Sequence, residues 1–460
     1  VGMRGTGWKK KCEGQGGMAG MARHLLEPLR LVKILCAHRA LLLLLELLLL
    51  LELLDGRADR AAVDDHGVAV LQALVKRVAV GRHPHRHEPD EQPELAQMYL
   101  VLAELAEQIF GDLATADRVA EVEATDDRFD RKLWGALAEA GLVGMVLPER
   151  DGGLGLGLVE TCLVLQQQGR RVAPVPLLAT TTLGAWAIAA YGSDALRARW
   201  LEGVAQGHRI LTGAWTDPAG TDESRPLTGL ADGVGWRVSG EKVAVAAAGV
   251  ADAVVVPVDT DGSRRVAVVP IDAEGLTVSL AETTSREIHG TLRFDNVAIC
   301  PEDLLDGDGD EITRSVLDRA QIGACAVVLG CCEEALAMTA AHVSEREQFG
   351  RPLSTNQGVA LQAADAAIDT EGIRVTLQQA AWSLDNGLDV SQAVPTAKWW
   401  ASEAGQRVVV TTQHLHGGTG ADISHPVHRY FLWVVHLADS LGGAGAHLAR
   451  LGSTIATRVS

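Results

Sequence analysis

The sequence predicts an α+β protein that is mostly α-helical, with a small β-domain between two helical regions. Apolar residues recur at helical spacing in residues 93–210 and again in residues 302–460. Between these regions, residues 211–301 divide into short runs that alternate apolar and polar side chains and end at Gly or Pro, which is typical of strands. We therefore expect three domains, 93–210, 211–301 and 302–460, preceded by a separate segment.

That first segment, residues 1–92, differs in composition from the rest of the chain. A basic, Gly-rich start leads into a leucine-rich run, residues 40–54, which Glu46 and Glu52 interrupt. A membrane span needs about 20 apolar residues and rarely holds charges, so we expect no stable membrane insertion. The His-rich tract at residues 83–87 contains a proline and an arginine, which favours a solvated linker over a metal site. We interpret residues 1–92 as a disordered or mis-set N-terminal extension and assign it no function.

The size and charge of the chain limit its class. Its 460 residues suffice for two to four domains, and its net charge is −18. A nucleic-acid partner is not expected, because phosphate binding needs a basic surface. The seven cysteines are scattered and odd in number, which indicates a reducing compartment such as the cytoplasm rather than a disulfide framework. No residue spacing typical of zinc sites occurs, so we expect no metal.

Glycines mark expected helix ends and turns in the first helical region and in the β-domain. Gly141 suits the end of an amphipathic helix. Gly152-Gly153 matches a dinucleotide-binding loop only weakly, because such a loop also needs a preceding strand, a following helix and a later acidic residue. Gly235 opens a run, residues 235–242, that we expect to form a hairpin. The expected helices cover residues 95–114, 127–140, 159–169 and, as a pair, 178–207, and the expected strands cover residues 253–258, 265–270 and 292–297.

The last region contains two helical runs, residues 320–343 and 357–382, separated by the stretch Arg346-Glu-Gln-Phe349-Gly-Arg-Pro-Leu353. Gly350 suits the position just after a helix, and Pro352 cannot continue one, so this stretch is expected to cap one helix and open the next. Further on, Gly417-Gly418 predicts a sharp helix exit. Exposed backbone N–H groups at such a turn can cradle a pyrophosphate.

Residues 346–353, together with Gln357 and the run Gln413-His-Leu-His-Gly-Gly-Thr-Gly420, resemble the acyl-CoA dehydrogenase family, and the resemblance covers residue 95 to the C-terminus. It implies an N-terminal helical domain, a small middle β-barrel or sandwich, and a C-terminal four-helix bundle. It also implies FAD as cofactor, an acyl-CoA thioester as substrate, and an electron-transfer flavoprotein or similar acceptor. In this family the matching segments reach across a subunit interface to a neighbour's FAD. The residues so implied are Arg346, Phe349, Gln357, His414, Gly417 and Gly418.

The resemblance also locates the catalytic base. Removing the α-proton of an acyl-CoA, while a hydride leaves Cβ for the flavin, requires a carboxylate. The two places where the family carries it correspond to Leu441 and Ala320, so no catalytic residue is assigned. Asp318 and Asp439 are weak candidates. We interpret Asp318 as a charge that favours the dipole of a nearby helix N-terminus.

The contacts that a subunit makes to its own flavin are altered in the same way. In the strand 240–246, Ala244 replaces the family's stacking Trp and Ala246 replaces a hydroxyl donor, while the preceding Thr216-Asp217-Pro218 turn is kept. The chain is therefore similar to the base-less subunits of heteromeric α2β2 acyl-CoA dehydrogenases that shorten steroid side chains. Three alternatives stay open: a homotetramer using Asp318 or Asp439, a non-enzymatic acyl-CoA-binding or scaffold protein, and a decayed copy.

Overall fold

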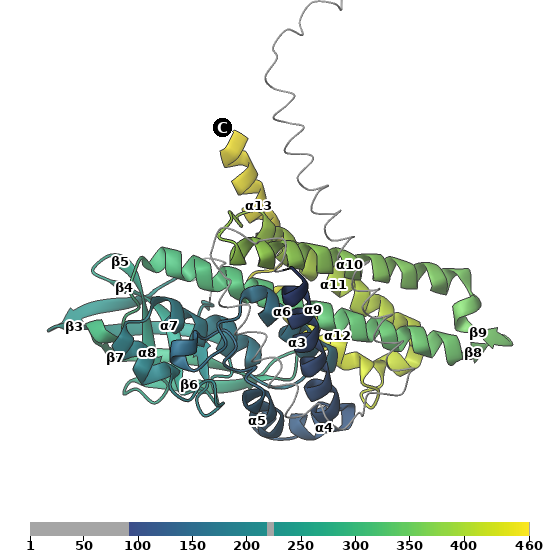
Figure 1. The fold of residues 1–460 in the computed structure, drawn as a ribbon, viewed down its shortest axis with the longest axis horizontal. Helices are drawn as coiled ribbons and strands as arrows, with labels where there is room; N and C mark the ends of the chain where they lie inside the picture. Colours follow the sequence, from purple (N-terminus) through teal and green to yellow (C-terminus); the bar gives the residue numbers. More distant parts are fainter. Residues whose placement is uncertain (1–91, 219–224, 460) are drawn as a thin grey trace, which may run out of the picture. The chain divides into compact units, whose positions relative to one another are not determined.

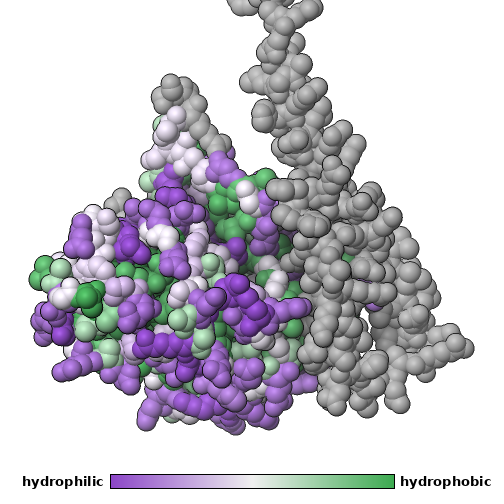
Figure 2. Space-filling model, turned by 60° about the vertical axis from the view of Figure 1, so that its left-hand side comes forward, coloured by the Kyte–Doolittle hydropathy of each residue, from purple (hydrophilic) through white to green (hydrophobic). Residues whose placement is uncertain are grey.

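The computed structural model describes residues 92–218 and 225–459 of the chain (Figure 1). The leucine-rich run and the His-rich tract lie outside the described residues. On the face drawn in Figure 2, hydrophilic side chains cover much of the surface, and hydrophobic side chains form separate groups among them. Helices come first along the described chain, strands follow, and long helices complete it, which confirms the mostly helical α+β fold class.

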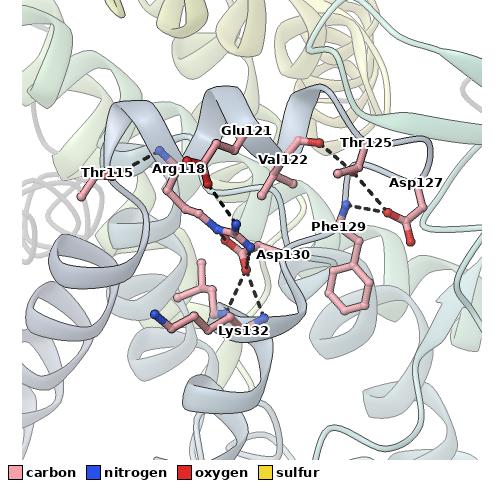
Figure 3. A network of polar contacts seen from close by, with 10 residues as sticks. Thr115, Arg118, Glu121, Val122, Thr125, Asp127, Phe129, Asp130 and Lys132 are labelled. Atoms are coloured by element: carbon pink, nitrogen blue, oxygen red, sulfur yellow. Dashed lines mark hydrogen bonds and ion pairs between the residues drawn. The ribbon is translucent and has the colours of Figure 1, made fainter.

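The N-terminal helices start with α3, and the best-defined boundary among them is the start of α5. The Asp130 side chain accepts hydrogen bonds from the backbone N–H groups of Lys132 and Leu133, and Arg118 Nε lies 2.8 Å from Asp130 Oδ2 (Figure 3). An N-cap of this kind satisfies N–H groups that have no partner within the helix. Consequently α5 begins four residues later than the expected helix. The bounds are α3 Gln92–Leu113, α4 Ala116–Glu123, α5 Arg131–Glu139 and α6 Leu158–Arg171.

The Gly152-Gly153 pair forms a tight backbone turn. Gly152 has φ +81°, a left-handed conformation that favours glycine, and a Cβ on Gly153 would overlap the carbonyl oxygen of Leu147. Close backbone packing explains both glycines, and no phosphate loop is needed. The turn follows the short η1 helix, and after α6 the chain continues through short helices. These are η1 Glu149–Asp151, η2 Ala179–Gly184, α7 Ala185–Tyr191 and α8 Asp194–Leu201.

The β-domain is a mixed sheet in which β1-β4-β2-β3-β7-β6 are neighbours and β5 pairs with β4. The expected hairpin within residues 235–242 is wrong, because this run lies inside one long strand, β3, and the turn precedes it, between Asp232 and Gly235. Strand β4 is buried on both faces. Val254 and Val256 face the β-domain core, while Val255 packs with the helical core. The bounds are β1 Leu211–Gly213, β2 Leu227–Asp232, β3 Gly235–Ala246, β4 Ala253–Thr260, β5 Ser263–Pro270, β6 Leu276–Glu282 and β7 Ile288–Ile299.

The C-terminal helices pack around α9, which contacts α6, α10, α11 and α12. Among the described residues, α9 is the one helix long and apolar enough to cross a membrane, but 72% of its apolar window is buried within the protein, as in a core helix. Its apolar side chains therefore hold the bundle together. The bounds are η3 Pro301–Asp303, α9 Gly309–Glu345, α10 Gln357–Asp385, α11 Ala393–Leu415, η5 Gly417–Ala421, α12 Val427–Asp439 and α13 Ala444–Val459.

The connection from α9 to α10 differs from the expected helix cap. Helix α9 ends at Glu345, and the strands β8 (Glu347–Gln348) and β9 (Arg351–Pro352) then pair at the far end of α9 (Figure 1). Phe349 (φ +57°) and Gly350 (φ +76°) form the turn between them. Two successive left-handed residues give the twist that a two-residue hairpin needs. Gly350 therefore serves the hairpin, and Pro352 lies in β9, beyond the end of the helix.

Candidate functional site

The residues expected to face a neighbour's cofactor lie at one end of the helical bundle and point to solvent. Arg346 is the C-cap residue of α9 and is exposed, and Phe349 at the hairpin tip is 98% exposed. Within residues 92–218 and 225–459, the Arg346 guanidinium has no hydrogen-bond or ion-pair partner. Arg351 in the same hairpin differs, because its Nη2 donates to Asn356 Oδ1 at 2.7 Å. The exposed Phe349 ring and the Arg346 guanidinium therefore form a surface that a partner or ligand can contact.

Gln357, His414, Gly417 and Gly418 are exposed as well. Gln357 is the first residue of α10, and His414 lies in the last turn of α11. Gly417 has φ +61°, and nothing lies within 4 Å of where a Cβ would stand on Gly417 or Gly418. The described chain therefore leaves room for a side chain at position 418, and the space beside Gly418 is open.

A stack of histidines joins the end of α9 to this glycine turn. The rings of His342 and His416 are stacked with centroids 4.6 Å apart, and the His425 ring lies 5.0 Å from that of His416. His416 is 4% exposed and its Nδ1 donates to the Thr412 carbonyl at 2.8 Å, so its Nε2, which has no partner among the described residues, is left as an acceptor. Burial lowers the pKa of His342 and of His425, and the neighbouring His416 lowers both further. The stacked rings fix the turn relative to Arg346.

The sequence reasoning singled out His414 and missed the structural part played by His342, His416 and His425. His416 lay within the quoted motif, but nothing in the local pattern indicates that His342 and His425 would contact it. The pairs are 74 and 9 residues apart in the chain. The packing of α9 against α11 brings His342 to His416, and the loop between η5 and α12 places His425 beside it.

The two positions expected for the family's base, Ala320 and Leu441, lie in segments that contact each other. Gln321, next to Ala320, donates through Nε2 to the Leu441 carbonyl at 3.1 Å, and His447 Nε2 donates to the same oxygen at 3.1 Å. Leu441 has φ +58° and packs against the core, and Ala320 is fully buried. The turn is thus held firmly, but both positions carry apolar side chains.

The weak candidate Asp318 is occupied by a structural contact. It is 4% exposed, and Arg450 Nη2 of α13 donates to its Oδ1 at 2.9 Å. Burial raises its pKa, and the charge of Arg450 opposes that rise. Its interpretation as a charge at a helix N-terminus is wrong, because α9 begins nine residues earlier, at Gly309. Asp318 instead joins α9 to α13.

The other weak candidate, Asp439, is the exposed last residue of α12. Next to it, the buried Lys398 Nζ donates to the carbonyls of Leu437 and Ala438 at 3.0 Å each. Burial lowers the pKa of Lys398 to about 8. A cation at carbonyl groups that have no helical partner stabilises the end of α12. Lys398 therefore positions the turn that contains Leu441.

In the β-domain, an ion pair joins the two segments that the resemblance assigns to flavin contacts, residues 216–218 and 240–246. Lys242 Nζ lies 2.7 Å from Asp217 Oδ1, and both side chains are buried. Burial lowers the pKa of Lys242, against the effect of Asp217. The ion pair ties the Thr216–Pro218 turn to β3, but Ala244 and Ala246 present neither an aromatic ring nor a hydroxyl. At these two positions the strand can pack against a ring but offers no side-chain hydrogen bond to it.

Comparisons with known proteins identify similar chains. Residues 102–208 match the acyl-CoA dehydrogenase N-terminal domain and residues 307–447 match the acyl-CoA dehydrogenase C-terminal domain. The acyl-CoA dehydrogenase FadE27 of Mycobacterium tuberculosis is 36% identical over 366 residues, which are 77% of this chain and 96% of that protein.

Two solved structures are also similar. A chain of the Tcur3481-Tcur3483 steroid ACAD is 43% identical with a TM-score of 0.75, covering 79% of this chain and 99% of that one. A chain of the ChsE4-ChsE5 complex from Mycobacterium tuberculosis is 35% identical with a TM-score of 0.75, covering 78% of this chain and 97% of that one.

Proposed function

Because this chain belongs to the acyl-CoA dehydrogenase family, we propose that it is the base-less subunit of a heteromeric α2β2 dehydrogenase and completes a FAD site on its partner. The observation that carries the proposal is an asymmetry. The residues that would face a partner's FAD are exposed, whereas the positions for the base and for the chain's own flavin contacts carry Leu441, Ala320, Ala244 and Ala246. A subunit with one half of the site needs a partner with the other half.

FAD, the cofactor of the family, fits the neighbour-facing half of this chain and does not fit the other half. On the fitting side, Arg346 has no competing partner and can pair with a phosphate, a charge-assisted contact worth about 1.5–3 kcal/mol. The backbone at Gly417-Gly418 is open to a phosphate, and Phe349 can pack on an apolar part of the cofactor. When bound, FAD supplies a hydride acceptor for the Cα–Cβ oxidation.

The outer face of α10 supports a homologous partner subunit. Leu361, Ile368, Val375 and Trp382 recur every seven residues and are 57%, 67%, 47% and 43% exposed. Residues seven apart lie on one side of a helix, so these side chains form an apolar stripe. A contiguous row of exposed apolar side chains is a mark of protein interfaces. With α2β2 symmetry, each stripe has a subunit of the assembly to cover it.

The relatives support a proposal for the substrate class. The Tcur3481-Tcur3483 relative is described as a steroid ACAD, and ChsE4-ChsE5 is a complex of two different subunits. The acyl group is therefore proposed to be a steroid side chain carried as a CoA thioester, and electrons leave through an electron-transfer flavoprotein or similar acceptor. The five cysteines that the structure describes are free, which supports the cytoplasm.

The test is a visible spectrum of the chain purified alone and then with a homologous partner subunit encoded beside it. The chain alone should carry little or no FAD, and the complex should carry about one FAD per two chains by flavin quantitation and mass photometry. A stoichiometric yellow preparation of the chain alone would refute the half-site and favour the homotetramer. A complex that binds acyl-CoA without any flavin would favour the non-enzymatic scaffold.

A further inference from the structure

Three potential metal ligands meet between the β-domain and α12. Glu287 lies in the turn before β7, His289 lies on β7, and His436 lies on α12. Their ligand atoms all lie within 4.8 Å of one another, and His289 Nε2 is 4.0 Å from Glu287 Oε2. The two imidazole rings meet edge to face with centroids 5.1 Å apart. Among the described residues, this is the group of three such side chains close enough to share one ion.

We propose that Glu287, His289 and His436 bind one divalent transition-metal cation, with Zn²⁺ as the best chemical match. Two imidazole nitrogens and one carboxylate form a ligand set that suits zinc and related metals and leaves a further coordination position open. Tetrahedral zinc with bonds of about 2.0–2.1 Å needs ligand atoms about 3.3 Å apart. The ligand atoms, which lie within 4.8 Å of one another, must therefore approach by up to about 1.5 Å when an ion binds.

The surroundings of the cluster favour an ion. His289 is largely buried, and its Nε2 is the ring nitrogen that faces Glu287. Glu287 is oriented by Ser285, whose Oγ donates to Oε2 at 2.9 Å, and Ser285 in turn lies 2.8 Å from Thr283 Oγ1. Hydroxyl contacts of this kind orient carboxylate ligands in metal sites.

The charges around Glu287 also favour a bound cation. The side chain of Arg286, next in sequence to Glu287, forms an ion pair with Glu123, with Nη1 3.3 Å from Oε2. The basic groups that face Glu287 in the described chain are therefore His289 and His436. A divalent ion would balance the negative charge of Glu287, whose side chain is 28% exposed.

The position of the cluster connects it with the altered flavin strand. His289 on β7 pairs in register with Ala246 on β3, one of the two positions where the family's flavin contacts are replaced. The ion would therefore join α12 to the β-sheet beside this strand. No sequence spacing predicts such a site, because His436 is 147 residues after His289. The inference does not rest on the proposed heteromeric function.

The experiment uses the full chain in which His83→Ala, His85→Ala and His87→Ala remove the competing His-rich tract. After dialysis against a chelator, Zn²⁺ binding is measured by calorimetry and metal content, and Co²⁺ is added as a spectroscopic probe. We expect one Zn²⁺ per chain, a visible Co²⁺ absorption that reports nitrogen and oxygen ligands, and a higher Tm with Zn²⁺. His436→Ala and Glu287→Gln should each weaken Zn²⁺ binding at least about tenfold and remove the gain in Tm.

The exposed His208 provides a matched control, because it is a histidine outside the cluster. His208→Ala should bind Zn²⁺ as the parent does. If the parent binds no Zn²⁺, or if His436→Ala and Glu287→Gln bind it as tightly as His208→Ala does, the inference is overturned. Circular dichroism of each variant without metal identifies one that fails to fold, and the remaining cluster variant then decides.

Discussion

Replacing Arg346 by alanine should separate cofactor binding from folding. The guanidinium is exposed and has no partner among the described residues, so Arg346→Ala should leave the Tm of the isolated chain unchanged. In the complex, the lost phosphate contact of about 1.5–3 kcal/mol should weaken FAD binding roughly 10- to 150-fold. The dissociation constant can be measured from the change in flavin fluorescence when the complex is diluted.

Arg351 is the matched control for this prediction. It is an arginine of the same hairpin and is exposed, but its guanidinium already donates to Asn356 at 2.7 Å. Arg351→Ala should therefore change FAD binding by no more than about twofold. Equal FAD affinities in the two variants would show that Arg346 is only a cation at a helix end. A lower Tm of the isolated Arg346→Ala chain would show that the residue supports the fold.

Three further predictions test neighbouring parts of the site. Gly418→Ala should leave the Tm unchanged but reduce FAD retention by the complex, because only the cofactor is expected to use the open space there; retention equal to that of the parent would contradict this. Asp318→Asn and Asp439→Asn should keep turnover of the complex within a few-fold, whereas loss of a catalytic base lowers it about 10²- to 10⁴-fold; a loss of that size in steady-state assays would place the base in this chain. Burial lowers the pKa of His447 to about 4, below its ordinary value of 6.5. The unfolded chain therefore takes up this proton first, and up to about 3 kcal/mol of stability is present above pH 6.5 and is lost as the pH falls through 4. Urea unfolding at several pH values should show this loss, and His447→Gln should reduce it while the exposed His208→Gln should not.

Local patterns in the sequence were sufficient for several helices and for three strands of the β-domain, β4, β5 and β7. Apolar residues at helical spacing predicted α3, α6, α9 and α10 to within a few residues at most boundaries, and α9 proved longer than its apolar run. These patterns work because the side of an element that is buried depends on spacing within that element alone. The acyl-CoA dehydrogenase family could also be inferred from sequence, since its motifs are short and contiguous.

The errors occurred where backbone conformation depends on more than residue type. A glycine after an apolar helix predicted a helix cap at Gly350, but the left-handed φ of Phe349 makes a hairpin turn there. A residue with a Cβ seldom adopts this conformation, so the residue type at position 349 did not indicate the turn. Likewise, Asp130 starts α5 because its side chain, which also pairs with Arg118, accepts hydrogen bonds from the first N–H groups of the helix.

The sequence by itself therefore determined the fold class, the family and the residue types at the flavin and base positions. Only the tertiary structure decided which of these residues meet. It set Gln321 beside Leu441, paired Asp318 with Arg450 across 132 residues, and stacked His342 on His416. The physical reason is that such contacts depend on how whole helices pack, and packing is determined jointly by all the buried side chains rather than by any local pattern.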